Sequence, residues 1–374
     1  MAGESERQAR LALSCATDGG DPAVADLLAR VGAEEAWRLV QNGALGEPVA
    51  QRAARVSPSV VRRLAVAAGI RFVIPGDEEW PESLADLGHA DPIQRRGGMP
   101  VGLWLRGPGP LAKLVRRSVA IVGSRAATAY GNGITTDLSV DLAERGVTVV
   151  SGGAFGIDAA AHRGTLSAGG ATVGVLACGV DVAYPQANGQ LFDQIAREHV
   201  LVSELPPGAH PTRVRFLSRN RLIAAMSSAT VVVEAALRSG ARNTAGWALE
   251  CGRPLMAVPG SVYSRASTAP HLMIRSGQAV LVTNAAEVME LVSTTGQDTL
   301  PLASGPPRAT DALSESQLAV YEAVPARRRA AVGDIALAAG VSVPSCLRAL
   351  TLLETAGLVE GDSRGWLATF GRPR

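Results

Sequence analysis

The chain contains 374 residues, which is too long for one compact domain and is typical of two or three. Hydrophobic residues make up 47% and charged residues 19%, a balance that excludes a disordered or collagen-like chain. Because 36 basic and 34 acidic residues leave a net charge of +2, any surface for nucleic acid must come from local clustering of charge.

Membrane insertion, secretion and metal binding find no support in the sequence. No apolar run reaches the roughly 18–20 residues that span a bilayer, and the first ten residues are polar, unlike a signal peptide. We therefore expect a cytoplasmic protein with no membrane segment. The four cysteines are far apart and form no CxxC pair, so we interpret them as buried thiols rather than disulfides or metal ligands. No metal or cofactor is predicted.

Residues 1–70 are predicted to form a small helical domain. Apolar residues recur at helical spacing in 7–15, 24–31 and 33–40, and Ser57 followed by Pro58 is typical of the start of a helix. Two interpretations remain open. The domain is either a packing or interaction module, or a SAM-like or helix–hairpin–helix module that touches DNA.

Residues 71–292 show the pattern of an α/β domain. Short apolar runs occur at 119–122, 147–150, 172–176, 200–202, 230–233, 255–258 and 279–282. The runs are continuous rather than alternating, as expected for parallel strands covered on both faces, and segments such as 131–145 and 188–198 leave room for crossover helices. We predict a doubly wound parallel sheet.

The remainder is predicted to be a linker and a third domain. Residues 293–312 are rich in Ser, Thr, Gly and Pro, as linkers are. Residues 313–374 contain three helical patterns, 314–324, 332–339 and 343–356, followed by a hairpin pattern within 358–369. Three helices and a hairpin indicate a winged-helix domain.

In an open parallel sheet, ligands bind at the carboxyl ends of the strands. Gly123-Ser124-Arg125 follows the first run, and a tight turn, a helix N-terminus and a guanidinium together suit a phosphate, although an ordinary turn remains the alternative. Ser151-Gly152-Gly153 follows the second run. Asp158 and His162 come next at a spacing of four, either as a catalytic pair or as a helix-start acid with a structural histidine.

The densest signal is the segment 211–221. Four arginines, Arg213, Arg215, Arg219 and Arg221, surround Phe216, and no acidic residue lies between Pro206 and Ala229. Arginines with an interleaved aromatic are typical of proteins that hold single strands through phosphate contacts and base stacking. The alternative is that these arginines pair with Glu204 and Glu234 in the core.

A third small-residue turn completes the predicted site. After Glu234, which we expect to accept hydrogen bonds from a neighbouring arginine, Ser239-Gly240 opens another helix that also carries Arg242. No GxSxG, HExxH or metal-spaced acidic cluster occurs. The predicted single-stranded DNA site consists of Gly123, Ser124, Arg125, Ser151, Gly152, Gly153, Arg213, Arg215, Phe216, Arg219, Asn220, Arg221, Ser239, Gly240 and Arg242.

These motifs resemble the DprA/Smf family of DNA-processing proteins. The matching segments, in family order, are VAIVGSR (119–125), VVSGGAFGID (149–158), CGVDVAYPQAN (178–188), SELPPG (203–208), RNRLI (219–223), VVEA (232–235), Ser239-Gly240 and VPGS (258–261). The resemblance implies an extended Rossmann-like core with a helical domain before it and a winged helix after it. It further implies a homodimer that binds single-stranded DNA regardless of sequence. Its implied role is to protect incoming strands in natural transformation and to load RecA recombinase. Because no catalytic motif occurs, we do not expect enzymatic activity.

By motif match, the binding residues implied are Arg125, the loop 151–153, Arg219, Arg221 and Ser239-Gly240. The chain departs from the family pattern at Phe155, where an arginine is common, and at Ala241, beside which Arg242 is a candidate replacement for lost polar contacts. Segment 266–274 also differs, which leaves the dimer geometry less defined.

Two other classes are kept as alternatives. Nucleotide phosphoribohydrolases of the lysine-decarboxylase-like group share this kind of sheet, but here Trp247 stands where their catalytic glutamate would be. A transcription regulator would act through the winged helix, with Arg327-Arg328-Arg329 near phosphates. However, Arg348 is the one basic residue in the predicted recognition helix, which disfavours specific reading of a duplex.

Overall fold

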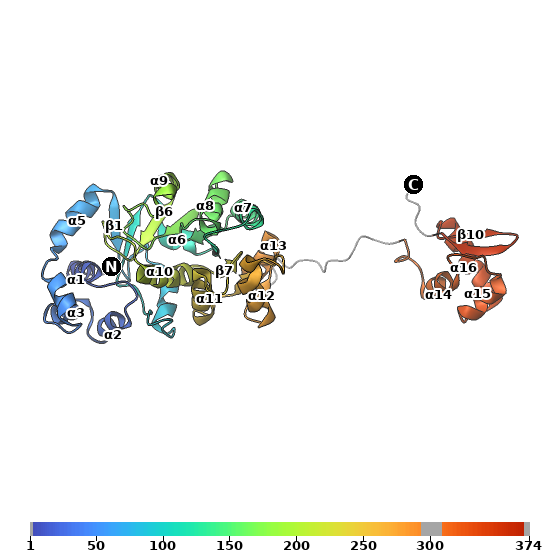
Figure 1. Cartoon of the computed structure of the whole chain (residues 1–374), viewed down its shortest axis with the longest axis horizontal. Coiled ribbons are helices and arrows are strands. Elements are labelled where there is room, and N and C mark those ends of the chain that lie inside the picture. The colour runs from blue at the N-terminus through green and yellow to red at the C-terminus, as the bar shows by residue number, and fades with distance from the viewer. Residues whose placement is uncertain (1–2, 293–308, 370–374) are drawn as a thin grey trace. The chain divides into compact units, whose positions relative to one another are not determined.

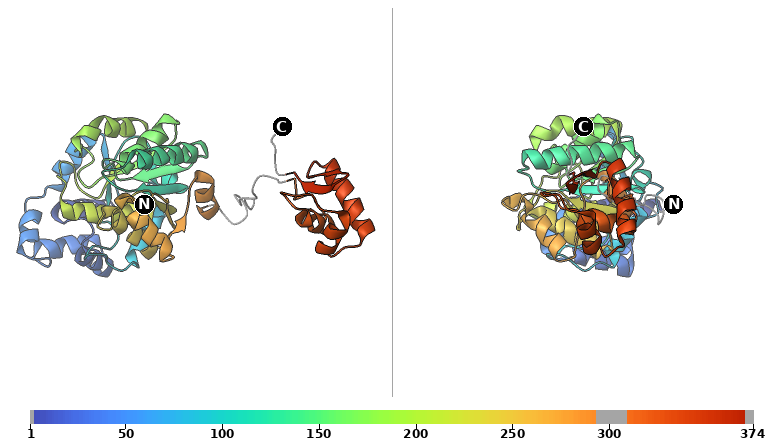
Figure 2. Two further views of the ribbon diagram at one scale, coloured as in Figure 1. Left: turned by 45° about the vertical axis from the view of Figure 1, so that its right-hand side comes forward. Right: turned by 90° about the vertical axis from the view of Figure 1, so that its right-hand side faces the viewer.

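The computed structural model describes residues 3–292 and 309–369, so most of the predicted linker, 293–312, lies outside the described residues. The described residues fall into two compact units, 3–292 and 309–369, each of which is treated by itself (Figures 1 and 2).

Unit 1 begins with a group of helices. They are α1 (Glu4–Ala16), α2 (Pro22–Val31), α3 (Ala33–Gln41), α4 (Glu47–Ala53) and α5 (Pro58–Ala67). Asp21 caps α2 by accepting a hydrogen bond from the Ala23 N–H, and Pro58 opens α5 as the sequence predicts. The group has its own small core, but Leu11 and Ala65 pack into the same cluster as Trp104 of the sheet. The helices therefore belong to the same compact unit as the sheet.

A nine-stranded sheet forms the centre of unit 1. The strands are β1 (Ile70–Val73), β2 (Leu103–Arg106), β3 (Ser118–Val122), β4 (Thr148–Ser151), β5 (Thr172–Val175), β6 (Val200–Ser203), β7 (Ala229–Val232), β8 (Leu255–Ala257) and β9 (Val280–Leu281). Their order is β1-β2-β6-β5-β4-β3-β7-β8-β9. The seven strands from β3 to β9 are parallel and confirm the predicted α/β sheet. The sequence did not predict β1 and β2, which add antiparallel strands at the β6 edge.

Two layers of helices cover the sheet. One face packs on α6 (Leu111–Val115), α10 (Arg213–Met226), α11 (Gly240–Glu250), α12 (Thr268–Arg275) and the 3₁₀ helix η1 (Glu82–Gly88). The other packs on α7 (Ala129–Glu144), α8 (Ile157–Ser167), α9 (Gly189–Glu198) and α13 (Ala285–Val292). Figure 1 shows α7–α9 and α10–α12 on opposite sides of the strands.

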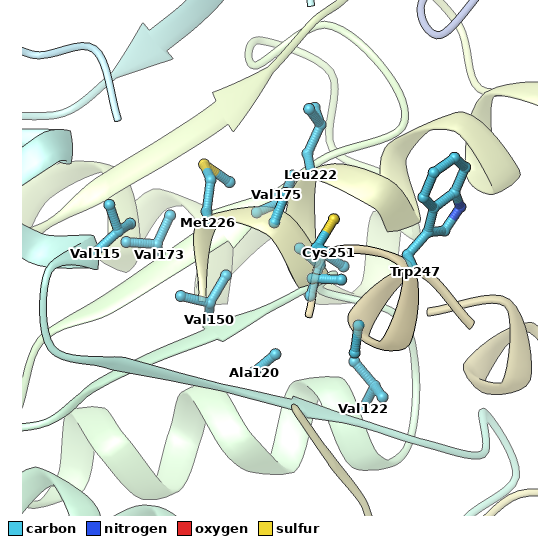
Figure 3. Packing of buried hydrophobic residues seen from close by; sticks show 14 of the residues in the cluster. Val115, Ala120, Val122, Val150, Val173, Val175, Leu222, Met226, Trp247 and Cys251 are labelled. Carbon is cyan, nitrogen blue, oxygen red and sulfur yellow. The ribbon is translucent and has the colours of Figure 1, made fainter. Parts of the chain in front are cut away.

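Alternation along the strands explains the double cover. Ala120 and Val122 of β3 join the core under α10 and α11, whereas Val119 and Ile121 join the core under α7 and α8. Figure 3 shows the first of these cores, where Val122 and valines of β4 and β5 lie near side chains of α10 and α11. Because every position of these strands is buried, the sequence is apolar without interruption, as the pattern predicted.

The strand order reverses between β3 and β7. From β3 the chain winds through β4, β5 and β6 on one side, and from β7 it winds through β8 and β9 on the other. A crevice opens at such a switch point beyond the carboxyl ends of the strands. The loops after β3 and β7 therefore flank the place where a ligand is expected.

Unit 2 contains three helices and a hairpin in residues 309–369. These are α14 (Glu315–Ala323), α15 (Val332–Ala338), α16 (Val343–Thr355), β10 (Val359–Asp362) and β11 (Gly365–Ala368). Ser314 and Gln317 form a capping box at α14. Val320, Ile335 and Leu350 meet in one core. The elements agree with those predicted, while assignment of the unit to the winged-helix class stays a prediction.

Among the helices of residues 3–292 and 309–369, none by itself has the length and apolar character needed to cross a membrane. The pair α15 and α16 meets these criteria only when the two helices are counted together, across a bend of 102°.

Candidate nucleic-acid interface

A cleft of about 1170 Å³ lies at the switch point of unit 1. Its walls come from the loops after β3 and β7, from the first three turns of α10 and from the start of α11. Arg125, Arg219 and Ser239, which sequence reasoning placed in three separate motifs, all line this cleft. The structure therefore brings together the predicted loops after β3 and β7 and the arginine-rich segment, but not the predicted residues 151–153 after β4.

Positive charge dominates the cleft. Its lining includes one carboxylate, Asp158, and five guanidinium groups, those of Arg125, Arg213, Arg219, Arg238 and Arg242. All of these arginines except Arg219 are exposed. Within residues 3–292 and 309–369, none of the five forms an ion pair with a carboxylate. Unpaired cations at the mouth of a cleft suit a polyanion.

The loop after β3 presents Arg125 to the cleft. Ser124 accepts a hydrogen bond from the Ala126 N–H at 3.2 Å, which tightens the turn. Thr128 then caps α7 by accepting from the Gly131 N–H. Arg125 consequently projects from a short, braced turn rather than from a loose loop.

Glu234 braces the same turn from the end of β7. Its carboxylate accepts hydrogen bonds from the Thr128 N–H at 2.9 Å and from the Thr128 hydroxyl at 2.6 Å. The expectation that an arginine would be its donor is therefore wrong. A buried carboxylate at the start of α7 is stabilised by the free N–H groups there, which need no cationic partner.

Phe216 forms an aromatic platform in the wall made by α10. The guanidinium carbon of Arg125 lies 4.7 Å from the centre of its ring, and that of Arg219 lies 5.9 Å away. The Tyr184 ring lies 5.7 Å from it, tilted by 53°. Phe216, Arg125 and Tyr184 also border a second cavity of about 150 Å³, which Arg219 does not line. A half-buried ring beside two cations places an aromatic group next to phosphate-binding groups, and the exposed Arg125 side chain can move aside for a stacked base.

Arg219 is a buried member of the site. It is 6% exposed, and its Nη1 donates to the carbonyls of Gly152 and Val175, both at 2.6 Å. Burial lowers the pKa of this guanidinium, and the charge of Asp158 partly offsets the effect. Arg219 thus ties the ends of β4 and β5 together and places positive charge beneath the Phe216 ring.

The loop 151–153 contributes to the architecture rather than to the cleft surface. The Ser151 hydroxyl is buried and donates to the Ile121 carbonyl, and the Gly153 carbonyl accepts from Asn188. The Arg219 side chain approaches the backbone at Gly152 so closely that only glycine fits, since a Cβ there would lie 2.1 Å from Nη1 of Arg219. None of the three predicted residues lines the cleft, and Gly152 borders the smaller cavity.

Arg215 and Arg221 are not brought to the cleft, and their predicted role needs correction. The segment is helical, and at roughly 100° per residue Arg221 lies on the opposite side of α10 from Arg219. Arg221 is fully buried and pairs with Glu204 at 2.7 Å, which is the alternative that the sequence left open. Arg215 donates to Asp18 from Nη2 at 2.9 Å. Both arginines attach α10 to the rest of unit 1.

The start of α11 forms the facing wall. Ser239 caps the helix through the Ala241 N–H, and Asn220 donates to the Gly240 carbonyl and to Oδ1 of Asn243. Asn220 therefore holds α10 and α11 at a fixed spacing across the cleft. Arg242 lies on the first turn of α11 and donates to the Leu237 carbonyl at 2.9 Å.

Asp158 and His162 have structural roles. Asp158 accepts from the Ala154 N–H at the start of α8, and burial raises its pKa despite the charge of Arg219. His162 is fully buried against the Thr172 hydroxyl at 2.7 Å, and burial lowers its pKa to about 3. A histidine that stays neutral and shielded from solvent is a poor proton carrier for a ligand in the cleft.

The four cysteines are free thiols. Cys178, Cys251 and Cys346 are buried and Cys15 partly so, and burial raises the pKa of Cys178 to about 11. In the part of the chain that the structure describes, no group of three or more His, Cys, Asp or Glu is placed to hold a metal ion.

Among the residues that border the cleft and were not predicted, Gln94, Tyr184 and Arg238 have long polar or aromatic side chains. Arg238 directly precedes the predicted Ser239-Gly240 turn, so its place in a strand-end loop was a usable signal. Tyr184 lies within a motif that was noted without a role. Gln94 lies in a turn before β2, far from every strand-end motif, and nothing local to it predicted its position.

Comparison with known proteins agrees with this geometry. The family model of DNA recombination-mediator protein A matches residues 71–293. A Mycobacterium tuberculosis protein that carries the name DNA processing protein DprA is 44% identical over 357 residues, 92% of this chain and 89% of its own. The DNA processing protein DprA of Bacillus subtilis is 39% identical over 46% of this chain and 58% of its own.

Two solved structures are also similar. DNA processing protein A of Streptococcus pneumoniae is 30% identical with a TM-score of 0.64, covering 79% of this chain and all of that one. A structure concerning the single-stranded DNA binding mode of DNA processing protein A from Helicobacter pylori is 28% identical with a TM-score of 0.50, covering 59% of this chain and 94% of that one. The chain therefore belongs to the DprA/Smf family of DNA-processing proteins.

Proposed function

We propose that this chain binds single-stranded DNA in the arginine-lined cleft without preference for sequence. The observation that carries the proposal is the Phe216 ring, which has the guanidinium carbons of Arg125 and Arg219 within 4.7 and 5.9 Å of its centre. Phosphates are neutralised by the exposed arginines, bases stack on the ring, and neither contact depends on which base is present. The Helicobacter pylori relative, whose structure concerns single-stranded DNA binding, supports the proposal.

Membership in the DprA/Smf family supports a proposal for the biological role. We infer that the protein protects incoming single strands during natural transformation and loads RecA recombinase onto them in the cytoplasm. Binding without sequence preference is what this role requires, because an incoming strand can have any sequence.

We further propose that the protein acts as a homodimer. The apolar side chains of Val262 and Tyr263 are 80% and 96% exposed, and Val280 and Leu281 on the edge strand β9 are about half exposed. Exposed apolar groups and an open sheet edge each favour pairing with another chain. Two clefts on one particle would raise the avidity for a long strand.

Catalysis is not part of the proposal. Trp247, which occupies the position of the catalytic glutamate in the phosphoribohydrolase alternative, is fully buried in the core under α11 (Figure 3). The regulator alternative gains no support either, because Arg329 of the basic run is engaged by Glu360 and Asp362.

The test compares oligonucleotides by fluorescence anisotropy. Oligothymidine, oligoadenine and a mixed sequence should bind with similar affinity, and a duplex of the mixed sequence should bind more weakly. Arg125→Ala should weaken all three single strands alike, whereas Arg145→Ala, an exposed arginine after α7 at the amino end of the strands, should change nothing. An Arg125→Ala protein that binds as tightly as wild type would remove this site from the proposal.

A further inference from the structure

A strained turn forms part of the cleft rim. Gln94 and Arg95 have φ angles of 51° and 62°, and among residues 3–292 and 309–369 they are the two non-glycine residues with positive φ. Ile93 and Arg96 pair across them, with the Arg96 N–H donating to the Ile93 carbonyl at 3.0 Å, which is the pattern of a two-residue hairpin turn. Side chains as large as these rarely adopt this backbone, and such conformations cluster at functional sites.

The turn is anchored on both sides. Ile93 packs against α11 so closely that a Cβ on Gly246 would lie 3.2 Å from Cδ1 of Ile93. On the other side, the Gly97 N–H donates to the Gly20 carbonyl in the loop between α1 and α2 at 3.1 Å. These contacts hold the turn in place and compensate for its backbone conformation.

The anchoring sets the turn beside the arginines of the cleft. Gly246 follows Arg242 by four residues, so that both lie on the same face of α11. Ile93 covers this face at Gly246, and Ile93 and Gln94 line the cleft together with Arg242. Arg95 at the tip is exposed, and within residues 3–292 and 309–369 it has no carboxylate or hydrogen-bond partner for its side chain.

We propose that the turn 93–96 is a third wall of the nucleic-acid cleft, in which Arg95 contacts a phosphate of the bound strand and Gln94 faces the adjoining nucleotide. This inference rests on the proposed function of the cleft. It extends the strand's path from the walls made by α10 and α11 to a segment that precedes the parallel sheet. Under this proposal the strained backbone is retained because glycine, which would adopt it without strain, has no side chain to contact a phosphate.

The test separates the effect of the turn's backbone conformation on binding from the effect of its side chains. Gln94→Asn combined with Arg95→Gly supplies the residue pair that a two-residue turn favours, so the turn persists without the guanidinium and the melting temperature stays the same or rises. Affinity for labelled oligothymidine should fall roughly threefold to tenfold, and the salt dependence of log K should flatten by about 0.7, the value for one phosphate on a single strand. Arg95→Lys should retain most of the affinity, and Arg145→Ala serves as the unaffected control.

The outcomes are distinguishable. A double variant that is folded, binds more weakly and shows the flatter salt dependence supports the third wall. A double variant that binds like wild type overturns it and leaves the proposed function standing. If wild-type protein itself fails to bind oligothymidine, the proposed function and this inference fall together.

Discussion

At the scale of single residues, the arginines of α10 have different functions that their positions in the sequence do not reveal. Arg213 is exposed at the cleft, Arg219 supports its floor, and Arg221 is buried in an ion pair with Glu204. Exposure and partner decide which guanidinium is available to a phosphate. An arginine already satisfied by a buried carboxylate would leave that charge unpaired if it turned to a ligand.

Phe216 allows a test of stacking apart from charge. Phe216→Leu keeps an apolar side chain but removes the aromatic face, and base stacking is worth roughly 1–3 kcal/mol, so affinity for oligothymidine should fall about 5-fold to 150-fold. The salt dependence of binding should stay as in wild type, since no phosphate contact is lost. Isothermal titration at several salt concentrations measures both quantities. A parallel loss of salt dependence would show that Phe216 acts through the arginines instead.

His162 predicts a pH dependence of stability. Its pKa in the folded protein is lowered to about 3 by burial, so the unfolded chain takes up this proton near pH 6.5 while the folded chain does not. The contribution of neutral His162 to the free energy of unfolding is therefore fully present above pH 6.5, and it is lost as the pH falls from there toward 3. Between pH 6.5 and 5 wild type should lose about 1.6 kcal/mol more than His162→Gln, measured by urea unfolding. Equal losses in the two proteins would contradict the buried, neutral histidine.

At the scale of elements, the sequence predicts β3–β8 well because strands buried on both faces leave an uninterrupted apolar pattern. It misses β1 and β2, since Arg71 and Arg106 interrupt short strands at the antiparallel edge. It also misses that 213–226 is helical, because arginines dominate the segment and hide the apolar spacing. The cleft residues on the strand-end loops were therefore predictable, while Arg215 and Arg221 were misplaced by treating a helix as a linear groove.

The arginines of α10 should differ in what they contribute, Arg221 to stability through its partner Glu204 and Arg213 to binding. Glu204→Gln leaves the fully buried Arg221 without its charged partner, so the free energy of unfolding should fall by about 3–5 kcal/mol. Arg213→Ala removes an exposed side chain, so stability should change by less than about 0.5 kcal/mol. Arg213→Ala should instead weaken binding of single strands. Urea unfolding and anisotropy on both variants test this division, which a destabilised Arg213→Ala protein would contradict.

At the scale of the whole molecule, unit 1 contains every residue that lines the cleft. The group of helices α1–α5 contributes through the loop after α1, where Asp18 holds Arg215 and Gly20 meets the turn 93–96. The amino-terminal helices are therefore part of the support of the site.

A chain that ends at residue 300 should bind single strands as well as the full chain. It retains the cleft, its arginines and both layers of helices, so the affinity for oligothymidine should agree with that of the full chain within about twofold, a difference of roughly 0.4 kcal/mol. Anisotropy on the two proteins at one salt concentration measures this. A large loss of affinity for oligothymidine on truncation would show that unit 2 contributes to binding.

The most direct measurement is the salt dependence of binding to a single strand, for wild type and for Arg125→Ala combined with Arg213→Ala. If the exposed arginines neutralise phosphates, log K for wild type falls linearly with log salt, and the double variant has a slope smaller by about 1.4, or about 0.7 for each lost contact. Arg145→Ala should keep the slope of wild type. A wild-type affinity that is insensitive to salt, or a double variant with an unchanged slope, would contradict binding through this cleft.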